Sequence, residues 1–549
     1  MPAHNRFDTH EVFNQSPPLV DVNLFAIDAP LRDAVAAYGA ASQSEALAAF
    51  GARWGSAEMA EQARLANENP PKLKTFDAKG YRRDTVEFHP AYHHFMAQSI
   101  SDGLHAMTWR LDGTRAAAPS EVARGARFYM AHQIEAGHLC PITMTRASIA
   151  ALAAEPALAQ RLMPTIISRH YDPSFKPFWE KFGMTLGMGM TEKQGGSDVR
   201  ANATRAVPVQ DGYVITGHKW FMSAPMCDAF LVLAQAPGGL TCFLMPRFRP
   251  DGSVNDLRFQ RLKDKVGNRS NASSEVEFLD AFAWRVGEEG RGVRTIIDMV
   301  QTTRVDCALG SAGLMRMALS QAIHHVRHRS AFQRRLADQP MMRTVLADLA
   351  LEIEAATAAV LRLCHALDQP ENAAEAAYAR LLTPVIKYWV CKTAPGFVYE
   401  TMECLGGNGY VEEGVLARFY REAPLNAIWE GCGNVMCLDV LRALDRDAEA
   451  ARSVFTTLAA VVGDLPGMAG ITASLGARLF GSPTEAEARA LVEQFALIAA
   501  LAALAKCAPD PITAAFASTR LRGRLRGYGT ADLDRDLVER LLDRALQSS

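Results

Sequence analysis

The chain has 549 residues, 49% of them hydrophobic, and its 58 basic and 60 acidic side chains almost balance. This length allows about three to five domains with large buried cores. Because the net charge is close to zero, composition predicts neither nucleic-acid binding nor membrane binding. A DNA-binding face would require a local cluster of cations.

The ten cysteines contain no CxxC pair, and the closest two, Cys432 and Cys437, have no nearby His. This pattern argues against a metal site and is typical of apolar thiols in a reducing compartment. The N-terminus lacks a basic start followed by an apolar core, and the longest apolar run, Phe495 to Ala505, is shorter than the ~20 residues that span a bilayer. We therefore expect a cytoplasmic protein without a membrane partner, and a buried helix at this run.

The N-terminal part of the chain is predicted to be helical. Residues 1–34 form an irregular extension, because prolines interrupt a segment without periodicity. Between about Asp33 and Tyr171, Ala, Leu, Glu and Arg dominate, which predicts a helical domain over 35–181.

The middle of the chain has the composition of strands and turns. Short β-branched or aromatic runs at 213–216, 230–234 and 241–245 are separated by Gly-containing turns, and 275–278 alternates charged and apolar residues. We predict a β domain over 182–289.

Helical composition returns after the β domain. We predict a helical region over 290–444 and an extra helical domain over 445–549, which is interrupted by turns that contain Pro and Gly. The predicted fold class is therefore mainly α with a central β domain.

Two segments of the chain near the β domain offer ligand contacts. In the run from Gly187 to Asp198, two adjacent glycines precede Ser197, so the backbone can approach a phosphate or a flat polar ring closely. A tight Gly-Gly turn is the simpler alternative. The run from Gly217 to Ser223 offers aromatic surface followed by a hydroxyl, although strand aromatics more often belong to a core.

Three further segments are informative only in combination. The run 263–273 is a polar, cationic turn that alone predicts a solvated hairpin, and 329–335 has the cations typical of a helix C-terminus. In the run 405–434, a Gly-Gly-Asn-Gly stretch is a weak phosphate-loop signal. Glu430 lies there between Trp and Gly in an apolar stretch, which suits a catalytic base but also an ordinary helix-entry turn.

Together, in this order, the segments resemble the acyl-CoA dehydrogenase family over roughly residues 35–444. The run 191–198 is similar to the family's TEPxAGSD, the run 219–223 to its KxWIT, and the run 429–432 to its YEGT. The resemblance implies an N-terminal helical domain, a β-barrel or sandwich domain and a C-terminal four-helix bundle, with FAD bound among them.

The resemblance also implies roles for individual residues. Glu430 would remove the α-proton of an acyl thioester while hydride passes to the flavin. Some members place this base on an earlier helix, where the present chain has Thr303. Thr191 and Ser223 would bond the edge of the flavin ring, and Phe221 would stack on it. Further FAD contacts would come from Met190, Gly196, Ser197, Met222, Arg329, Phe332, Gly406, Gly407, Ile428, Trp429, Gly431, Gly433 and Asn434.

Three residues depart from the family pattern. Gln333 replaces a usual Gly and Glu403 a usual Gln at positions that help a neighbouring subunit hold FAD, and Lys193 replaces a Pro in the loop over the flavin. Arg329 and Phe332 still resemble residues that contact a neighbour's FAD. The resemblance therefore implies a homotetramer, the usual assembly of the family.

The resemblance narrows to the AidB branch of this family through the opening run 9–15, the run 261–273 and the helical segment after the bundle. In that branch the extra segment is associated with double-stranded DNA, and the protein with defence against alkylating agents. We expect an FAD-containing, DNA-binding protein with weak acyl-CoA dehydrogenase activity of the isovaleryl-CoA type. The alternative is a catabolic dehydrogenase of short or branched acyl-CoAs without a DNA role.

A predicted DNA-contacting row lies near the end of the chain. Arg520, Arg522, Arg524 and Arg526 alternate with Leu and Gly. In an extended chain all four would point the same way, about 6.6 Å apart, which suits phosphates and reads no bases. The alternative is a solvated turn neutralised by nearby Asp residues. Arg442, at the junction with the bundle, adds to the predicted face.

Overall fold

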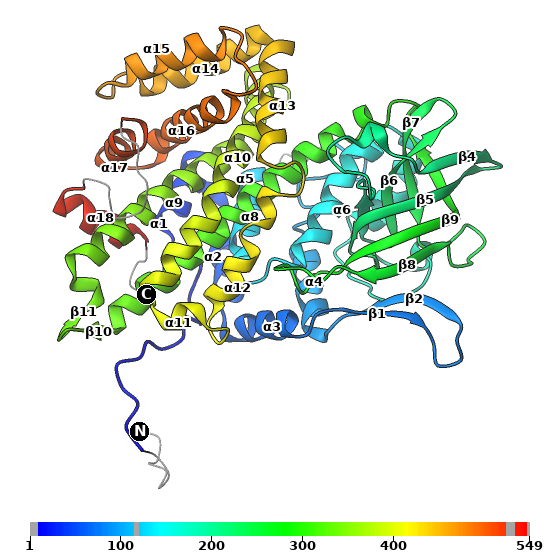
Figure 1. Cartoon of the computed structure of the whole chain (residues 1–549), viewed down its shortest axis with the longest axis horizontal. Coiled ribbons are helices and arrows are strands. Elements are labelled where there is room, and N and C mark those ends of the chain that lie inside the picture. Colours follow the sequence, from blue (N-terminus) through cyan, green and yellow to red (C-terminus); the bar gives the residue numbers. More distant parts are fainter. Residues whose placement is uncertain (1–8, 115–119, 523–532, 546–549) are drawn as a thin grey trace.

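The chain forms an elongated molecule with a helical body at one end and a β domain at the other (Figure 1). This computed structural model describes residues 9–114, 120–522 and 533–545. One large hydrophobic core joins helices of the N-terminal, central and C-terminal segments, and a second core fills the β domain and the helices against it. The succession of helices, strands and helices confirms the predicted fold class.

Short helices make up most of the N-terminal segment. They are α1 (Ala29–Ala37), α2 (Ser44–Trp54), α3 (Ala57–Glu68), α4 (Pro90–Asp102), α5 (Glu121–His132), α6 (Leu139–Leu152) and α7 (Pro156–Ile166). Ser56 and Ser120 cap α3 and α5, because each side chain accepts a hydrogen bond from a backbone amide of the first turn.

The expectation of helices throughout this segment is wrong at one place. β1 (Lys72–Phe76) and β2 (Arg82–Glu87) form an antiparallel hairpin that extends as an arm beneath the β domain in Figure 1. The turn is fixed by Asp77, whose carboxylate accepts hydrogen bonds from the backbone amides of Lys79 and Tyr81. Charged side chains dominate β2 and alternate with Leu73 and Thr75 in β1, so the sequence did not show the usual apolar strand pattern.

Strands of the β domain close into a barrel-like ring. In order of pairing the ring contains β6 (Ala229–Ala236), β7 (Gly239–Pro246), β9 (Ser273–Val286), β5 (Gly212–Ser223) and β4 (Arg205–Val209), which returns to β6. Two more strands join its edges, β3 (Leu186–Gly189) at β6 and β8 (Leu257–Leu262) at β9. Each strand segment predicted from the sequence lies within one of these strands.

The helical body is built on long helices. These are α8 (Gly292–His328), α9 (Pro340–Leu367) and α10 (Ala373–Cys404), with α13 (Gly433–Arg446) against α10. A small hairpin of β10 (Ser330–Ala331) and β11 (Arg334–Arg335) follows α8. The short helices α11 (Gly407–Tyr410) and α12 (Val415–Glu422) connect α10 to α13.

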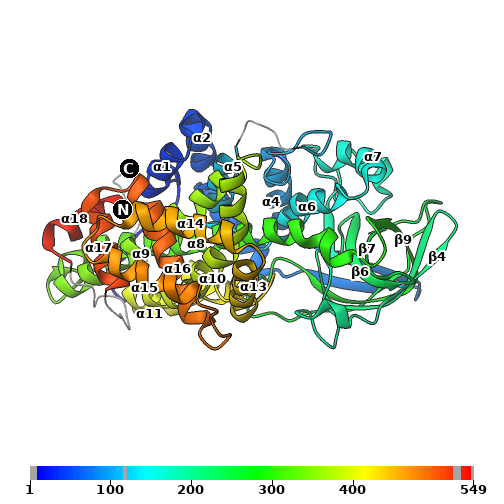
Figure 2. The same cartoon turned by 90° about the horizontal axis from the view of Figure 1, so that it is seen from above.

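The last segment is helical, as predicted, and packs on α9 and α10. It contains α14 (Ala448–Val462), α15 (Met468–Leu479), α16 (Ala488–Cys507), α17 (Asp510–Phe516) and α18 (Arg535–Ala545). α16 includes the predicted apolar run. Its length and composition would allow it to cross a membrane, but it is largely buried among neighbouring helices (Figure 2).

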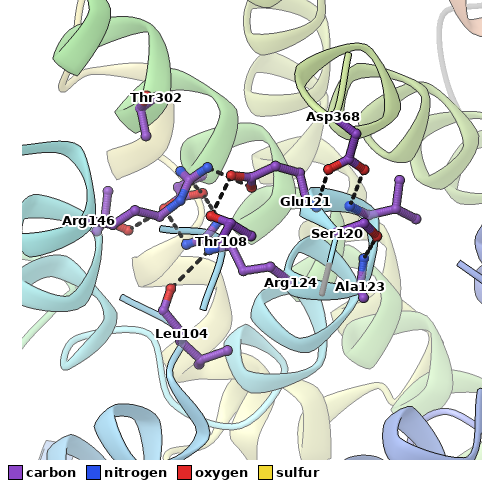
Figure 3. A network of polar contacts seen from close by, with 12 residues as sticks. Leu104, Thr108, Ser120, Glu121, Ala123, Arg124, Arg146, Thr302 and Asp368 are labelled. Carbon is purple, nitrogen blue, oxygen red and sulfur yellow. Dashed lines mark hydrogen bonds and ion pairs between the residues drawn. The ribbon is translucent and has the colours of Figure 1, made fainter. Parts of the chain in front are cut away.

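A buried ionic network joins the N-terminal helices to α8 (Figure 3). Arg124 of α5 and Arg146 of α6 both pair with Asp306 of α8, and Arg146 also pairs with Glu121 at 2.7 Å. All four side chains are at most 3% exposed. Because buried charges are costly without their partners, the network fixes the position of α8 one helical turn away from Thr303.

Candidate active site

Glu430 lies in the turn that leads into α13. Its backbone has φ 58, in the left-handed region, and Gly431 follows at φ 99. This conformation costs a residue with a Cβ on the order of 1–2 kcal/mol. The surrounding contacts must therefore stabilise the turn.

Two cations hold this turn through its carbonyl groups. Lys387 of α10 donates to the carbonyl oxygens of Trp429 and Gly431 at 3.0 and 2.9 Å. Arg304 of α8 donates to the carbonyl oxygen of Glu430 at 3.0 Å. Three successive carbonyls thus have cationic donors, and both α8 and α10 determine where Glu430 lies.

The Glu430 carboxylate is oriented by a hydroxyl. Thr303 Oγ1 of α8 donates to Glu430 Oε2 at 2.7 Å. The side chain is half-buried, and its other oxygen has no partner among the described residues. A carboxylate that is held at one oxygen and open at the other has the geometry that proton abstraction requires.

The start of α13 offers further polar groups beside Glu430. Gly433 begins the helix, and Asn434 is exposed on its first turn. A helix N-terminus favours anionic groups such as phosphate. Ile428 is 63% exposed, whereas Trp429 is fixed by a hydrogen bond of 2.8 Å from its indole Nε1 to Asn426.

A buried ion pair that the sequence analysis missed anchors the loop after β3. Glu192 Oε1 and Lys219 Nζ lie 2.7 Å apart, and neither side chain is exposed. Glu192 also accepts the backbone amides of Ala203 and Thr204. Burial raises the pKa of Glu192, but the hydrogen bond and charge of Lys219 together with these amides hold it at about 2. The pair therefore ties this loop to β5.

The loop carries predicted flavin contacts next to this anchor. Among the described residues, neither the Thr191 nor the Ser197 hydroxyl has a hydrogen-bond partner, so both are available to a ligand. Met190 is half-buried at the start of the loop. A Cβ on Gly196 would lie 2.5 Å from Thr191 Oγ1, so the close packing here requires glycine.

The end of β5 presents alternate side chains to opposite sides of the sheet. Phe221 is 49% exposed and available for stacking, but Met222 is 0% exposed inside the β-domain core. The side chain of Met222 is therefore not available to a cofactor, which leaves only its backbone for the predicted contact. Ser223 is half-buried, with its hydroxyl oxygen 3.2 Å from Ser273 Oγ.

The cationic turn at 263–273 is not the solvated hairpin that its composition alone predicts. Glu422 of α12 accepts hydrogen bonds from the backbone amide and the side-chain amide of Asn268, at 2.6 and 3.0 Å. Ser270 donates to the buried carboxylate of Glu135 at 2.6 Å. The carboxylates that dock this turn come from distant parts of the chain, so composition could not show them.

Cys140 of α6 has a thiol whose pKa depends on groups of both the β domain and the helical body. Burial raises the pKa of this thiol to about 11, the charge of Lys265 and hydrogen bonds with Ser223 and Asn271 lower it, and the charge of Glu430 raises it. The thiol is therefore protonated at neutral pH.

A second group of predicted FAD contacts lies at the opposite end of the helical body from the β domain (Figure 1). Arg329 follows α8, Phe332 forms the tip of the β10–β11 hairpin, and Gly406 and Gly407 lie at the start of α11. Phe332 is 95% exposed, and a Cβ on either glycine would meet nothing within 4 Å. One copy of the chain does not bring this group to its own β domain.

The N-terminal extension supports the β10–β11 hairpin. Asn14 accepts a hydrogen bond from the Ser330 amide at 2.7 Å and donates to its carbonyl at 2.9 Å, while Arg329 donates to the Asn14 carbonyl at 2.8 Å. Phe332 and Gln333 have φ 52 and 62, as in a two-residue turn with both central residues left-handed. This conformation explains why Gly is usual at the second position, which here is Gln333.

Arg520, the first residue of the predicted row of arginines, is not in an extended segment. Arg520 lies in a helical turn (Ala517–Leu521) and pairs with Asp348 and Glu352 of α9 at 2.5 and 2.6 Å. Its side chain is 9% exposed. The prediction that Arg520 contacts DNA phosphates is therefore wrong, because two carboxylates of α9 already bind its guanidinium.

Other members of the predicted DNA-contacting set differ from Arg520. Arg442 is 66% exposed and pairs with Asp439 at 2.8 Å. Arg522 is exposed, and Arg524 and Arg526 lie outside the described residues.

Comparison with known proteins defines the class of this chain. Residues 187–281 and 290–444 match the middle and C-terminal domains of acyl-CoA dehydrogenases, and residues 14–173 match the N-terminal domain of the adaptive response protein AidB. The chain belongs to the acyl-CoA dehydrogenase family. Members of this family bind FAD, and the free hydroxyls, exposed aromatic ring and open glycines described above fit that cofactor. The chain is an FAD-dependent oxidoreductase of this family.

Within the family, the chain is an AidB-like member. It is 47% identical to AidB of Escherichia coli (strain K12) over 95% of its length and 96% of that protein. It is 31% identical to acyl-CoA dehydrogenase family member 11 of Caenorhabditis elegans over 72% of its length and 66% of that protein.

The fold is also that of solved members. ACDH-11 of Caenorhabditis elegans in complex with C11-CoA superimposes with a TM-score of 0.84 at 25% identity, over 99% of this chain and 95% of that one. An acyl-CoA dehydrogenase of Bacillus anthracis with FAD has the same fold, with a TM-score of 0.63 at 17% identity, over 83% and 79% of the chains. Among the described residues, no group of three or more His, Cys, Asp and Glu side chains could hold a metal ion.

Proposed function

We propose that Glu430 is the catalytic base of an acyl-CoA dehydrogenase reaction on short or branched acyl thioesters of the isovaleryl-CoA type. The observation that carries this proposal is the orientation of its carboxylate by Thr303, in a turn held by Lys387 and Arg304. An acyl-CoA as substrate is also supported by the family and by the C11-CoA bound to the neighbour ACDH-11.

In this reaction the protein positions the substrate and moves one proton. Bound FAD supplies the hydride acceptor. The open oxygen of Glu430 takes the α-proton of the thioester, while Thr303 keeps the other oxygen in place. Thr191 and Ser223 would hold the flavin edge, and Phe221 would provide the stacking surface.

Flavin bleaching tests this proposal. Purified protein reconstituted with FAD is mixed anaerobically with isovaleryl-CoA, and the loss of flavin absorbance is followed. We expect bleaching by the wild type, at a low rate for this branch. Protein that cannot be loaded with FAD, or loaded protein that no acyl-CoA bleaches, would contradict the proposal.

The proposal includes assembly as a homotetramer in the cytoplasm. Arg329 and Phe332 lie on the exposed end of the helical body, so they can cover FAD only when a second copy places its cofactor there. Light scattering of the FAD-loaded protein tests the assembly, and a monomer with fully bound FAD would contradict it.

The second part of the proposed function is duplex DNA binding in the response to alkylation damage. It is supported by the match to the adaptive response protein AidB and by the similarity to the E. coli AidB over 95% of the chain. Arg442 and Arg522 are exposed cations of the C-terminal part, and Arg524 and Arg526 follow in sequence. Contacts from such residues to phosphates bind DNA without reading its sequence.

A salt titration of duplex binding tests the DNA role. We compare the wild type with a variant in which Arg442 and Arg522 are changed to Ala, and with a charge-matched control, Arg64→Ala with Arg83→Ala on α3 and β2. Each lost phosphate contact should reduce the slope of log affinity against log salt by about 0.9. The slope of the first variant should therefore be smaller by about 2, and that of the control should be unchanged. Equal slopes in all three proteins would remove these arginines from the function.

The alternative function is a catabolic dehydrogenase without a DNA role. It predicts rapid turnover with a short or branched acyl-CoA and no duplex binding at low salt. The same two assays therefore separate it from the proposal.

A further inference from the structure

The cationic turn between β8 and β9 contains a lysine with an unusual set of partners. The ammonium of Lys265 donates to the backbone oxygen of Asn271 at 2.7 Å, to Ser273 Oγ at 3.1 Å and to Asn268 Oδ1 at 3.5 Å. Among the described residues it forms no ion pair with a carboxylate. Its charge is therefore held by neutral oxygens and not cancelled by direct contact.

The position of Lys265 is fixed by the rest of the turn. Asn268 has φ 55 and is bound through its backbone and side chain to Glu422, and Ser270 is bound to Glu135. The turn is thus pinned between α12 and the N-terminal helices, and Lys265 cannot move away without breaking these buried contacts.

A chain of hydroxyls leads from Lys265 to the predicted flavin contact. Ser273 begins β9 and is the direct cross-strand partner of Ser223 at the end of β5. The two hydroxyl oxygens lie 3.2 Å apart. The order Lys265, Ser273, Ser223 therefore runs from the docked turn to the edge of the site.

The ammonium sets the direction of this chain. A lysine ammonium has only donors, so Ser273 must accept from it, and its single proton can then be donated to Ser223. Ser223, having accepted that proton, has one proton of its own to donate, to a ligand or to the Cys140 thiol. We propose that Lys265 is a positioning residue that, through Ser273, makes Ser223 a hydrogen-bond donor to the flavin edge and places a positive charge behind it. This inference rests on the proposed function in taking Ser223 as a flavin contact.

Electrostatics support the same role. Burial lowers the pKa of Lys265 to about 8, while Cys140 of α6 and Glu422 of α12 raise it. The group therefore remains a cation at neutral pH. A fixed positive charge beside a cofactor stabilises its more electron-rich, reduced form, so Lys265 should raise the reduction potential of the bound flavin.

The test is the midpoint potential of the bound flavin, measured by anaerobic dye titration without any acyl-CoA. We expect Lys265→Met and Lys265→Gln to shift the reduction equilibrium at least tenfold toward the oxidised form, a fall of about 30 mV for a two-electron couple. Gln keeps a hydrogen-bond donor and loses the charge, so comparison of the two variants separates loss of the hydrogen bond from loss of the charge. Arg269→Gln is the matched control, because Arg269 is an exposed cation of the same turn, and it should leave the potential unchanged.

A second variant keeps the test decisive if Lys265 cannot be replaced without loss of FAD. Ser273→Ala removes one oxygen from the chain and leaves the cation in place, and we expect it to change the flavin absorption spectrum and lower the potential. Unchanged spectrum and potential in the FAD-loaded Lys265 or Ser273 variants would overturn the inference. Wild-type protein that fails to bind FAD would instead overturn the proposed function, so the two failures are distinguishable.

Discussion

The Glu430 turn and the Phe332 hairpin differ in how the chain supports residues assigned to the same cofactor. The Glu430 carboxylate accepts a hydrogen bond from a hydroxyl, and cationic side chains donate to the backbone carbonyls around it. All of these donors belong to the same chain. Phe332 is 95% exposed at the tip of a small hairpin.

This difference separates two kinds of functional residue. A group that acts on a substrate within its own subunit is oriented by buried contacts before the substrate arrives. A group that acts on another subunit, such as the Phe332 ring, stays exposed in the single chain even where its backbone is held, and its apolar surface is covered only on assembly. We therefore expect changes near Glu430 to alter chemistry and stability, and changes near Phe332 to alter cofactor retention and assembly.

The largest effect should come from the base itself. Glu430→Gln keeps the shape of the side chain and its contact with Thr303 but removes the basic oxygen, so bleaching by acyl-CoA should fall about 10³-fold or more. Stopped-flow absorbance measures the rate, and the flavin content of the variant is the control. Full activity would mean that the base lies elsewhere.

The next largest effect should come from the buried network behind the base. Asp306→Asn leaves Arg124 and Arg146 without their shared carboxylate, so the free energy of unfolding should fall by about 3–5 kcal/mol. Urea denaturation measures this change. Arg64→Gln breaks exposed ion pairs with Glu61 and Glu68 and should cost far less, because water screens exposed charges. Equal losses in the two variants would show that the network does not fix α8.

The hydroxyl beside the base should have an intermediate effect. Thr303→Val removes the donor to Glu430 while keeping the side-chain shape, and a hydrogen bond to a charged group contributes about 1.5–3 kcal/mol. We expect the bleaching rate to fall about 10- to 100-fold, with KM little changed. Thr302→Val is the control, because that hydroxyl bonds the Asp298 carbonyl of its own helix. A rate loss in the control and not in Thr303→Val would contradict the assigned orientation of Glu430.

The sequence indicated candidate residues for the site around Glu430 but not the contacts that hold them in place. Thr191, Ser197, Ser223 and Glu430 lie in short runs whose glycines and hydroxyls are contiguous, so the pattern is visible along the chain. Their supports join distant residues, as Thr303 joins Glu430, and no local pattern encodes such pairs.

The predicted fold class followed from composition, but two local predictions failed for tertiary reasons. The β1–β2 hairpin was missed because its strands are short and rich in charged side chains, especially β2. Arg520 was expected in an extended row, whereas the carboxylates of Asp348 and Glu352 on α9 bind it in a helical turn. Those partners lie more than 150 residues away along the chain.

The smallest effect on the isolated chain should come from the hairpin. Phe332→Ala should change the free energy of unfolding by less than about 0.5 kcal/mol, because the ring is exposed. FAD affinity should nevertheless fall about tenfold, the order expected for one lost contact of about 1.4 kcal/mol, and the assembly should weaken. Phe76→Ala, an exposed aromatic residue on β1, is the control and should change neither. Unchanged FAD affinity in Phe332→Ala would mean that the hairpin does not contact the cofactor.

The most direct test of the account is complementation between subunits. Glu430→Gln protein lacks the base, and Arg329→Ala protein lacks a contact to a neighbour's FAD, so each should be impaired alone. When differently tagged chains are mixed and co-assembly is verified by pull-down, a site with intact Glu430 from one chain and intact Arg329 from the other should form. Random pairing predicts recovery of about a quarter of wild-type bleaching. Co-assembled protein with no activity above that of the separate variants would contradict a site completed by two copies.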